Sequence, residues 1–365
     1  MKIAIDVSQV VYGTGVSQYT RNLIENLFKI DKENEYLLFA GSLRRKKDIL
    51  NIFPKAKVFP IPPTLLNILW NKLHILPLEK LVGSVDVVHT SDWTEPPGSA
   101  FKVTTVHDLA PFIYPNLFPR DVLRNIVDTH RSRLYWVRQE SDRIIVPTNA
   151  TKKDLVNLGF DEAKIRVIPE APNTSFKKES SDVVERVARK FKIYGDYVIS
   201  VGIDPRKNTQ RLVKAFEHAT AGRDIKLVFV GTPKYSKLKV SRNIRMLGNV
   251  STDDLRALYS GAKALLYPSL YEGFGLPILE AFSCGCPVLT SNRSSMAEVA
   301  GDAAVLVDPE SVESIGDGIE KILRGPKAFI DKGSKRVNEF SWEKAARMTL
   351  DVYREAQLER GIRAK

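Results

Sequence analysis

The stretch ALLYPSLYEGFGLPILEAFSCGCPVLTS, residues 264–291, decides the fold because it contains a strand, a loop, a helix and a second strand in succession. ALLYPS predicts the first strand, and YEGFG predicts a glycine-rich loop. Pro277 fits the first turn of a helix that we expect to run to about Ser283, because proline is favoured at that position. CPVLTS then predicts the second strand. This succession is typical of a parallel sheet covered by helices.

The same alternation extends along the rest of the chain and divides it in two. One series of strand-like runs lies before the polar segment 173–182, and a second series follows it. The first comprises KIAID, YLLFA, KVFPI, VDVVH, KVTTVHD, RIIVP and KIRVIP, and the second comprises YVISVG, KLVFVG, IRMLG, AKALLYPS, CPVLTS and AAVLVDP. Because 365 residues exceed one ordinary core, we expect an α/β protein. Its two doubly wound, Rossmann-like domains, 1–172 and 173–340, are expected to face each other across a cleft.

Composition and charge restrict the function classes. The chain is 43% hydrophobic and 27% charged, as in globular proteins. No apolar run reaches the roughly 18 residues of a membrane-spanning helix, and the N-terminus has no signal-peptide pattern, so we expect a cytoplasmic protein. The net charge of +12 is compatible with nucleic acid, an anionic membrane or phosphorylated ligands. The densest basic run, 44–47, lacks the interleaved aromatic residues of a single-strand binder, which disfavours nucleic acid.

The two cysteines of the sequence, Cys284 and Cys286, are expected to be small buried side chains. They are too close in sequence for an ordinary disulfide, and no second pair completes a zinc site.

In doubly wound sheets, ligands bind beyond the carboxyl ends of the strands, so the residues after each strand are the candidates. After KIAID, Gly13 and Gly15 precede a helix expected over residues 16–30. These glycines allow a backbone approach to a phosphate, although a plain tight turn fits equally well. His107 follows KVTTV, where its imidazole is either structural or a partner for a sugar hydroxyl or phosphate. His89, in a similar position, is interpreted as structural.

Two cations and two glutamates follow strands of the second series. Arg206 and Lys207, after YVISVG, either neutralise a diphosphate or belong to a solvated loop. Glu280 lies about one turn inside the expected helix, where its charge suits the helix dipole and where it can accept hydrogen bonds from a ribose diol. Glu272 lies on the glycine-rich loop without a capping role, which makes it a candidate site residue.

Taken together, these segments resemble the retaining, nucleotide-sugar-dependent glycosyltransferases of family 4, which have the two-domain GT-B fold. The resemblance covers nearly the whole chain. It rests on GTGVSQYTRNL (13–23), TVHDL (105–109), VPTNATKKDL (146–155), RVIPEAPN (166–173), VGIDPRKN (201–208), LGNVSTDDLRALYSGA (247–262) and, above all, EGFGLPILEAFSCGCPV (272–288) followed by AEVAGDAA.

The resemblance implies a role for each charged candidate. It implies that Glu280 holds the nucleotide ribose and that Glu272 contacts the hydroxyls of the transferred sugar. Arg206 and Lys207 match a basic pair on the diphosphate. Many members carry the arginine directly after the strand's glycine, where this chain has Ile203. This departure leaves open how much Arg206 contributes to binding the diphosphate.

Further matches concern the loops, one histidine and the C-terminus. The loop whose backbone would bind the sugar and the diphosphate comprises Gly273, Phe274, Gly275 and Leu276. His107 corresponds to a histidine near the donor sugar, and Gly13 and Gly15 correspond to a glycine loop that meets donor and acceptor. Residues 341–365 are implied to form a helix that crosses back to the first domain.

The implied activity is retaining transfer of a hexose from a nucleotide-diphosphate sugar to a saccharide or lipid-linked acceptor, in surface-polysaccharide or glycolipid assembly. PRKN and VHDLAPFIYPNLFP resemble bacterial mannosyltransferases, which favours GDP-mannose over UDP-linked hexoses. No cofactor and no metal is implied, because the sequence lacks an Asp-x-Asp motif and Asp253-Asp254 predicts a helix start. Two alternatives remain: another GT-B enzyme, such as a nucleotide-sugar epimerase or a phosphorylase, and, from charge alone, a nucleic-acid-binding protein.

One apolar stripe leaves two interpretations open. Residues 64–81, TLLNILWNKLHILPLEKL, combine several leucines with Trp70, and Pro77 is expected to interrupt any helix there. The stripe is either core or, together with the basic run 44–47, a peripheral contact with an anionic inner membrane surface that presents a lipid-linked acceptor.

Overall fold

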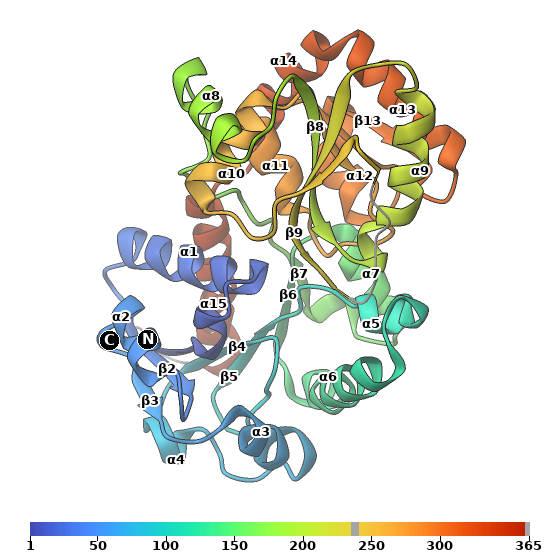
Figure 1. Ribbon diagram of the computed structural model, residues 1–365. Helices are drawn as coiled ribbons and strands as arrows, with labels where there is room; N and C mark the ends of the chain where they lie inside the picture. The colour runs from blue at the N-terminus through green and yellow to red at the C-terminus, as the bar shows by residue number, and fades with distance from the viewer. Residues whose placement is uncertain (235–240, 362–365) are drawn as a thin grey trace. The chain divides into compact units, whose positions relative to one another are not determined.

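The computed structural model describes residues 1–234 and 241–361 and divides into two compact units (Figure 1). The first unit comprises Met1–Phe112, Arg120–Glu170 and Trp342–Lys365, and the second comprises Ile113–Pro119 and Ala171–Ser341. Each unit has its own parallel sheet and its own hydrophobic cores.

In the described part of the chain, the first unit contains a seven-stranded parallel sheet with the order β3-β2-β1-β4-β5-β6-β7. Its strands are β1 Lys2–Asp6, β2 Glu35–Gly41, β3 Lys57–Phe59, β4 Val87–Ser91, β5 Phe101–Thr105, β6 Arg143–Val146 and β7 Ile165–Val167. Each strand overlaps one of the seven strand-like runs predicted from the sequence. The chain places β2 and β3 on one side of β1 and returns to β4 on the other, so the topological switch point lies between β1 and β4.

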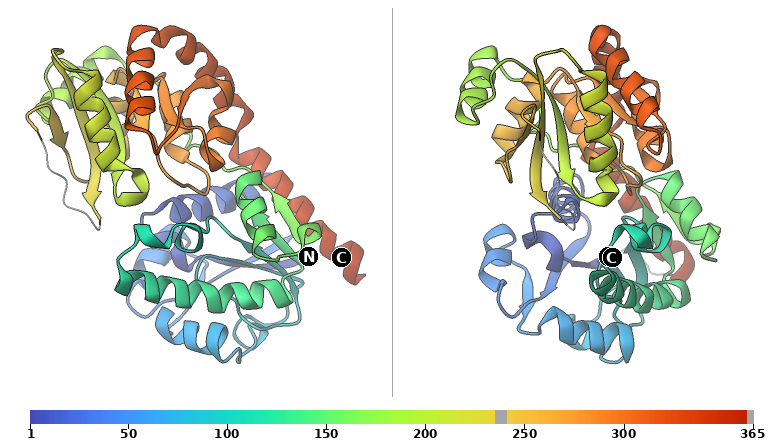
Figure 2. Two further views of the ribbon diagram at one scale, coloured as in Figure 1. Left: turned by 90° about the vertical axis from the view of Figure 1, so that its right-hand side faces the viewer. Right: turned by 45° about the vertical axis from the view of Figure 1, so that its right-hand side comes forward.

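Helices cover both faces of this sheet. They are η1 Ser8–Val11, α1 Gly15–Ile30, α2 Lys46–Ile52, α3 Pro63–Leu66, the π-helix η2 Asn67–Lys72, α4 Glu79–Val82, α5 Ala110–Ile113, α6 Arg120–Glu140, α7 Asn149–Asn157, η4 Glu162–Lys164 and α15 Trp342–Arg360. The helices α1 and α15 pack against each other on one face (Figure 2). The Tyr353 hydroxyl of α15 lies 2.6 Å from His89 Nδ1 of β4, within hydrogen-bond distance. The helices η2 and α6 contact each other, and they contribute Trp70 and Val137 to two separate hydrophobic cores.

The expected first helix begins where the sequence predicted it. Thr14 is its N-cap and forms a capping box with Ser17, because each side chain accepts a hydrogen bond from the other residue's backbone N–H. The helix α1 then runs from Gly15 to Ile30.

The second unit contains a six-stranded parallel sheet in its described residues, with the order β10-β9-β8-β11-β12-β13. Its strands are β8 Asp196–Ile203, β9 Ile225–Pro233, β10 Ile244–Met246, β11 Leu265–Tyr267, β12 Val288–Ser291 and β13 Ala304–Val307. The switch point of this sheet lies between β8 and β11. The two doubly wound α/β sheets predicted from the sequence are therefore confirmed.

The helices of the second unit also form two layers. They are η3 Pro115–Leu117, α8 Ser181–Lys190, η5 Pro205–Lys207, α9 Thr209–Ala219, α10 Thr252–Gly261, α11 Leu276–Ser283, α12 Ser294–Ala300, η6 Gly301–Ala303, α13 Val312–Arg324, α14 Pro326–Arg336 and η7 Val337–Glu339. The helices α9 and α13 lie side by side over one core, while α10 and α11 contribute to the core on the opposite face (Figure 2). The sequence prediction that Asp253-Asp254 starts a helix is confirmed, because Ser251 caps α10.

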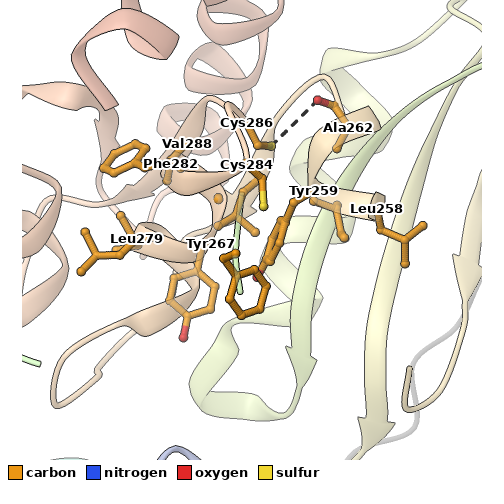
Figure 3. Packing of buried hydrophobic residues seen from close by; sticks show 14 of the residues in the cluster. Leu258, Tyr259, Ala262, Tyr267, Leu279, Phe282, Cys284, Cys286 and Val288 are labelled. Atoms are coloured by element: carbon orange, nitrogen blue, oxygen red, sulfur yellow. Dashed lines mark hydrogen bonds between the residues drawn. The ribbon is translucent and has the colours of Figure 1, made fainter. Parts of the chain in front are cut away.

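Both cysteines belong to the core beside α11. Cys284 and Cys286 are free and buried among Tyr259, Tyr267 and Phe282 (Figure 3). Burial raises the pKa of the Cys284 thiol to about 12, so it stays protonated near neutral pH. The prediction that these are small buried side chains is confirmed.

The apolar stripe 64–81 divides between core and surface. Leu66 and Trp70 are buried, and the Trp70 indole donates to the Leu76 carbonyl at 3.0 Å. Leu65 and Leu73 are instead 42% and 58% exposed. Pro77 lies between η2, which ends at Lys72, and α4, which begins at Glu79, so the expectation that no helix continues through Pro77 is confirmed. Among the described residues, no helix is both long and apolar enough to span a membrane.

Candidate active site

The switch point of the second sheet brings three of the predicted residues together. Arg206 and Lys207 lie on η5 after β8, and Glu272 lies on the loop after β11. The Glu272 carboxylate accepts from Arg206 Nη1 at 2.6 Å and from Lys207 Nζ at 2.7 Å. Sequence analysis assigned the two cations and the glutamate separately, and the structure shows that they form one cluster.

The loop that carries the two cations is fixed at both ends. Asp204 caps η5 by accepting from the Lys207 backbone N–H at 3.0 Å. Asn208 adopts φ 58° and donates to the Pro268 carbonyl at 3.1 Å, which ties the loop to the end of β11. Gly202 has φ 86°, and a Cβ there would meet Lys207 Cε at 3.0 Å, so a side chain at 202 would crowd the lysine.

Glu272 is ionised in its ion pairs. Its side chain is 8% exposed; burial raises its pKa, but Arg206 and Lys207 outweigh burial and hold the pKa at about 2. Its contribution to stability is therefore present above its ordinary pKa and is lost as the pH falls toward about 2. Lys207 also lies 4.6 Å from the Tyr267 ring centroid and bonds its hydroxyl, while Ser295 Oγ donates to the Glu272 carbonyl at 2.6 Å.

The glycine-rich loop ends at the N-terminus of α11. Gly275 is the N-cap with φ 99°, a conformation that other residues rarely adopt, and Leu276 begins the helix. Phe274 is buried and packs edge-on against Phe340, so its side chain belongs to the core. Only the backbone of Phe274 is suited to a ligand. Gly273 lies between these residues and Glu272 on the same loop.

Glu280 has an environment opposite to that of Glu272. It lies inside α11, is buried, and accepts one hydrogen bond from Tyr259 Oη at 3.3 Å. Burial raises its pKa to about 7. Two glutamates whose pKa values differ in this way are suited to different tasks, since Glu272 is ionised at neutral pH and Glu280 titrates near neutral pH.

His107 lies in the first unit, immediately after β5, and both of its ring nitrogens have partners. Nε2 is 2.9 Å from Ser91 Oγ, and Nδ1 is 3.2 Å from Glu170 Oε1. The Tyr19 ring meets the imidazole edge-on at 4.6 Å. Sequence analysis did not single out Ser91 or Glu170, although both lie at the carboxyl ends of strands, which is the signal that could have found them.

Two other strand ends carry predicted residues of the first unit. Gly13 has φ 67°, and a Cβ on Gly13 or Gly15 would meet nothing within 4 Å. Only Gly13 therefore needs glycine for its conformation. His89 is buried, with Nδ1 2.6 Å from Tyr353 Oη and Nε2 2.8 Å from Thr105 Oγ1, so its structural interpretation is confirmed.

Ile203 stands where many members of the family carry an arginine, and the structure shows what this residue does instead. Ile203 ends β8 and is buried in a hydrophobic core. Arg206, three residues later, supplies the guanidinium that reaches Glu272.

The chain is similar to known glycosyltransferases in both sequence and fold. The family model described as Glycosyltransferase Family 4 matches residues 13–176, and the model described as Glycosyl transferases group 1 matches residues 188–338. O-antigen chain mannosyltransferase B of Escherichia coli is 28% identical over 97% of this chain and 100% of its own length. O-antigen chain mannosyltransferase RfbU of Salmonella typhimurium is 27% identical over 62% of each protein. A sucrose-phosphate synthase from Thermosynechococcus elongatus superimposes with a TM-score of 0.75 at 19% identity, over 97% of this chain and 98% of that chain, which shows the fold.

Glu280 generates a prediction about pH. If Glu280 holds the ribose of a nucleoside diphosphate, affinity for GDP or UDP should increase as the pH rises through about 7, because the ionised carboxylate is the better acceptor. Isothermal titration calorimetry across this range measures the effect, with Glu280→Gln as the variant that removes it. The ligand's own phosphate ionisation is common to both proteins and cancels.

The sign of the linked stability change is also fixed. Because burial raises the pKa of Glu280 in the folded chain to about 7, above the ordinary value of a glutamate, the unliganded chain loses stability as the pH rises from that ordinary value toward about 7. An equal pH dependence of GDP and UDP affinity in the native chain and in Glu280→Gln would contradict the assignment.

Proposed function

This chain belongs to the family 4 glycosyltransferases with the GT-B fold, and we propose that it transfers a hexose with retention from a nucleotide-diphosphate sugar. The acceptor is a saccharide or lipid-linked saccharide in surface-polysaccharide or glycolipid assembly. The observation that carries the proposal is the cluster of Arg206, Lys207 and Glu272 at the switch point of the second sheet. Mannose from GDP-mannose is favoured, with UDP-linked hexoses as the alternative, because two relatives are named O-antigen mannosyltransferases.

The reaction places charge where the cluster can stabilise it. The bond between the anomeric carbon and the diphosphate oxygen breaks, and a bond from the acceptor oxygen forms on the same face of the sugar. The acceptor proton moves to the departing diphosphate. Negative charge thus grows on the diphosphate, where Arg206, Lys207 and the first N–H groups of α11 are suited to bind it. Because Arg206 and Lys207 stabilise the charge on the departing diphosphate, the proposed reaction uses neither a metal ion nor another cofactor.

Glu272 has two partners to exchange during donor binding. In the unliganded chain its carboxylate forms ion pairs with both Arg206 and Lys207. A diphosphate that binds the same two cations replaces this carboxylate, which frees it to accept hydrogen bonds from the hydroxyls of the transferred sugar. Donor binding and release of Glu272 are therefore coupled.

The first unit carries its own group of candidate residues around His107. Glu170 holds the His107 ring through Nδ1, and Nε2 faces the Ser91 hydroxyl, which a sugar hydroxyl can replace. Gly13 and Gly15 border open space, which is compatible with a loop that meets donor and acceptor.

Replacing Glu272 tests the proposed roles. Glu272→Gln should lower transfer from GDP-mannose by about 10- to 100-fold, because a charge-assisted hydrogen bond to the sugar is lost. The same change should tighten GDP binding by about tenfold, since two cations are left without their carboxylate. Radiolabelled-sugar transfer and calorimetry measure the two effects. Glu310→Gln, which removes an exposed partner of Arg293, is the matched control and should change neither.

Three outcomes separate the proposal from its alternatives. Near-normal transfer in Glu272→Gln would remove this residue from the site. Fast conversion of the nucleotide sugar without any acceptor would favour an epimerase. Activity that EDTA abolishes and magnesium or manganese restores would contradict the metal-independent reaction.

We also propose a peripheral contact between the first unit and the inner membrane face. Leu43 is 58% exposed directly before the basic run 44–47, and Leu65 and Leu73 are exposed on the stripe 64–81. Arg45 pairs with Asp48 and donates to the Val11 carbonyl, so it contributes less free charge than its neighbours. Exposed apolar side chains beside cations are typical of proteins that bind anionic lipid surfaces.

Vesicle flotation tests this contact. The chain should float with anionic vesicles at low salt and remain in solution at high salt, because each basic residue contributes about 1 kcal/mol that salt screens. Replacing Arg44, Arg45, Lys46 and Lys47 by glutamine should reduce binding. The control set carries the same charge change on the second unit, at Lys321, Arg324, Lys327 and Lys335. The proposal would be contradicted if the chain never floated with anionic vesicles, or if the 44–47 variant and the control variant lost vesicle binding equally.

A further inference from the structure

A short segment of the motif VHDLAPFIYPNLFP, residues 106–119, belongs to the second unit. The chain leaves the first unit after Phe112 and returns to it at Arg120, so Ile113–Pro119 forms part of the second unit. We call this segment the strap. The residues of the second unit that the strap lies against indicate what it does there.

Proline makes the strap stiff. Pro115 and Pro119 lie within it, and each fixes its own φ and restricts the residue before it. Pro115 begins the 3₁₀-helix η3 Pro115–Leu117, and the Leu117 N–H donates to the Tyr114 carbonyl at 3.1 Å. A segment with so little conformational freedom loses little entropy when it holds a neighbouring loop in place.

Tyr114 packs against the loop that carries Glu272. The ring centroids of Tyr114 and Tyr271 lie 5.8 Å apart at an interplanar angle of 49°. Tyr271 is buried and directly precedes Glu272 in the sequence. The Tyr271 carbonyl accepts from Arg206 Nη1 at 3.4 Å, and the same nitrogen donates to the Glu272 carboxylate at 2.6 Å. The Tyr114 ring therefore supports the residue next to the carboxylate of the cluster.

Leu117 lies beside the two loops that meet at the cluster. It borders a cavity of about 360 Å³ whose lining also includes Pro205 and Leu270. Pro205 begins η5, which carries the two cations, and Leu270 lies on the loop of Glu272. The Leu270 N–H donates to the Arg206 carbonyl at 2.8 Å, which joins the two loops. The strap thus lies against a pair of loops that are bonded to each other.

The proposed exchange of partners requires the Glu272 backbone to stay in place while its side chain moves. Donor binding removes the ion pairs of Glu272 with Arg206 and Lys207. The Ser295 hydroxyl holds the Glu272 carbonyl at 2.6 Å, and Tyr114 supports the preceding residue. A backbone that is fixed in this way presents the released carboxylate in one position, which favours productive contact with a sugar.

We propose that Tyr114 is a positioning residue for the donor sugar, because its ring holds Tyr271 and thereby fixes where the Glu272 carboxylate meets the sugar hydroxyls. This inference rests on the proposed transferase function and deepens it. Tyr114 acts through Tyr271 rather than by contact with the substrate. Since Arg206 and Lys207 bind the diphosphate, the strap affects affinity for the sugar more than affinity for the diphosphate.

Calorimetry with GDP-mannose and GDP tests this role. In Tyr114→Ala the affinity for GDP-mannose relative to GDP should fall by about twofold to tenfold, because a loop that is less often in the binding position lowers the apparent affinity. Tyr114→Phe keeps the ring and should retain the native ratio. Asn116→Ala, which truncates an exposed side chain on the same strap, is the matched control and should bind like the native chain.

Hydrogen exchange measures the loop without any donor. The peptide that spans residues 268–276 should exchange at least about twofold faster in Tyr114→Ala than in the native chain, because the Leu270 N–H loses part of its protection. Leu117→Ala removes the strap's other side chain at these loops and should also speed exchange. It decides the test if thermal melting shows that Tyr114→Ala does not fold. Asn116→Ala should leave exchange unchanged.

The outcomes separate this inference from the proposed function. An equal ratio of GDP-mannose to GDP affinity, or equal hydrogen exchange, in the native chain and Tyr114→Ala overturns the role of Tyr114, and continued transfer then leaves the function standing. Equal losses of GDP-mannose and GDP affinity, which a general disturbance of the unit would produce, also overturn it. If the native chain transfers no sugar and binds neither nucleotide, the function falls, and hydrogen exchange alone decides whether the strap holds the loop.

Discussion

The ion pairs that join Glu272 to Arg206 and Lys207 are the interaction on which the proposed chemistry depends. Three charged groups are largely buried where two neighbouring strands, β8 and β11, end, which costs free energy unless each charge has a partner. With two cations and one carboxylate, the cluster keeps one excess positive charge. A diphosphate carries enough negative charge to neutralise both cations, so the unliganded cluster is arranged to exchange one anion for another.

The parallel sheet explains how Lys207 and Glu272, 65 residues apart in the sequence, come within hydrogen-bond distance of each other. The order of the second sheet makes β8 and β11 neighbours, and their carboxyl ends point to the same edge. The helix α11 begins at that edge with Gly275 in a left-handed conformation, so its first N–H groups lie beside the cluster's loop. Eight residues after Glu272, Glu280 is buried in the helix, and burial raises the pKa of Glu280 to about 7. Topology thus gives two similar carboxyl groups different protonation behaviour.

Sequence reasoning predicted the strands well because strands buried on both faces are continuous apolar runs. It also placed the start of α11, since Pro277 marks the first turn. It did not find Glu170 or Ser91 as partners of His107, because they are 63 and 16 residues away and no spacing rule links separate strand ends. It did not anticipate the π-helix Asn67–Lys72 either, since a 3.6-residue period cannot separate the buried Trp70 from the exposed Leu73. The roles of the cations followed from chemistry, whereas their pairing with Glu272 required the fold.

The central claim is that Arg206 and Lys207 bind the diphosphate of the donor, and calorimetry of Lys207→Ala tests it most directly. The account predicts that GDP and UDP affinity falls by about 10- to 100-fold, since a charge-assisted contact to phosphate is lost. Lys214→Ala, on the exposed side of α9, removes an equal charge and should bind like the native chain. Unchanged affinity for both nucleoside diphosphates in Lys207→Ala would contradict the account.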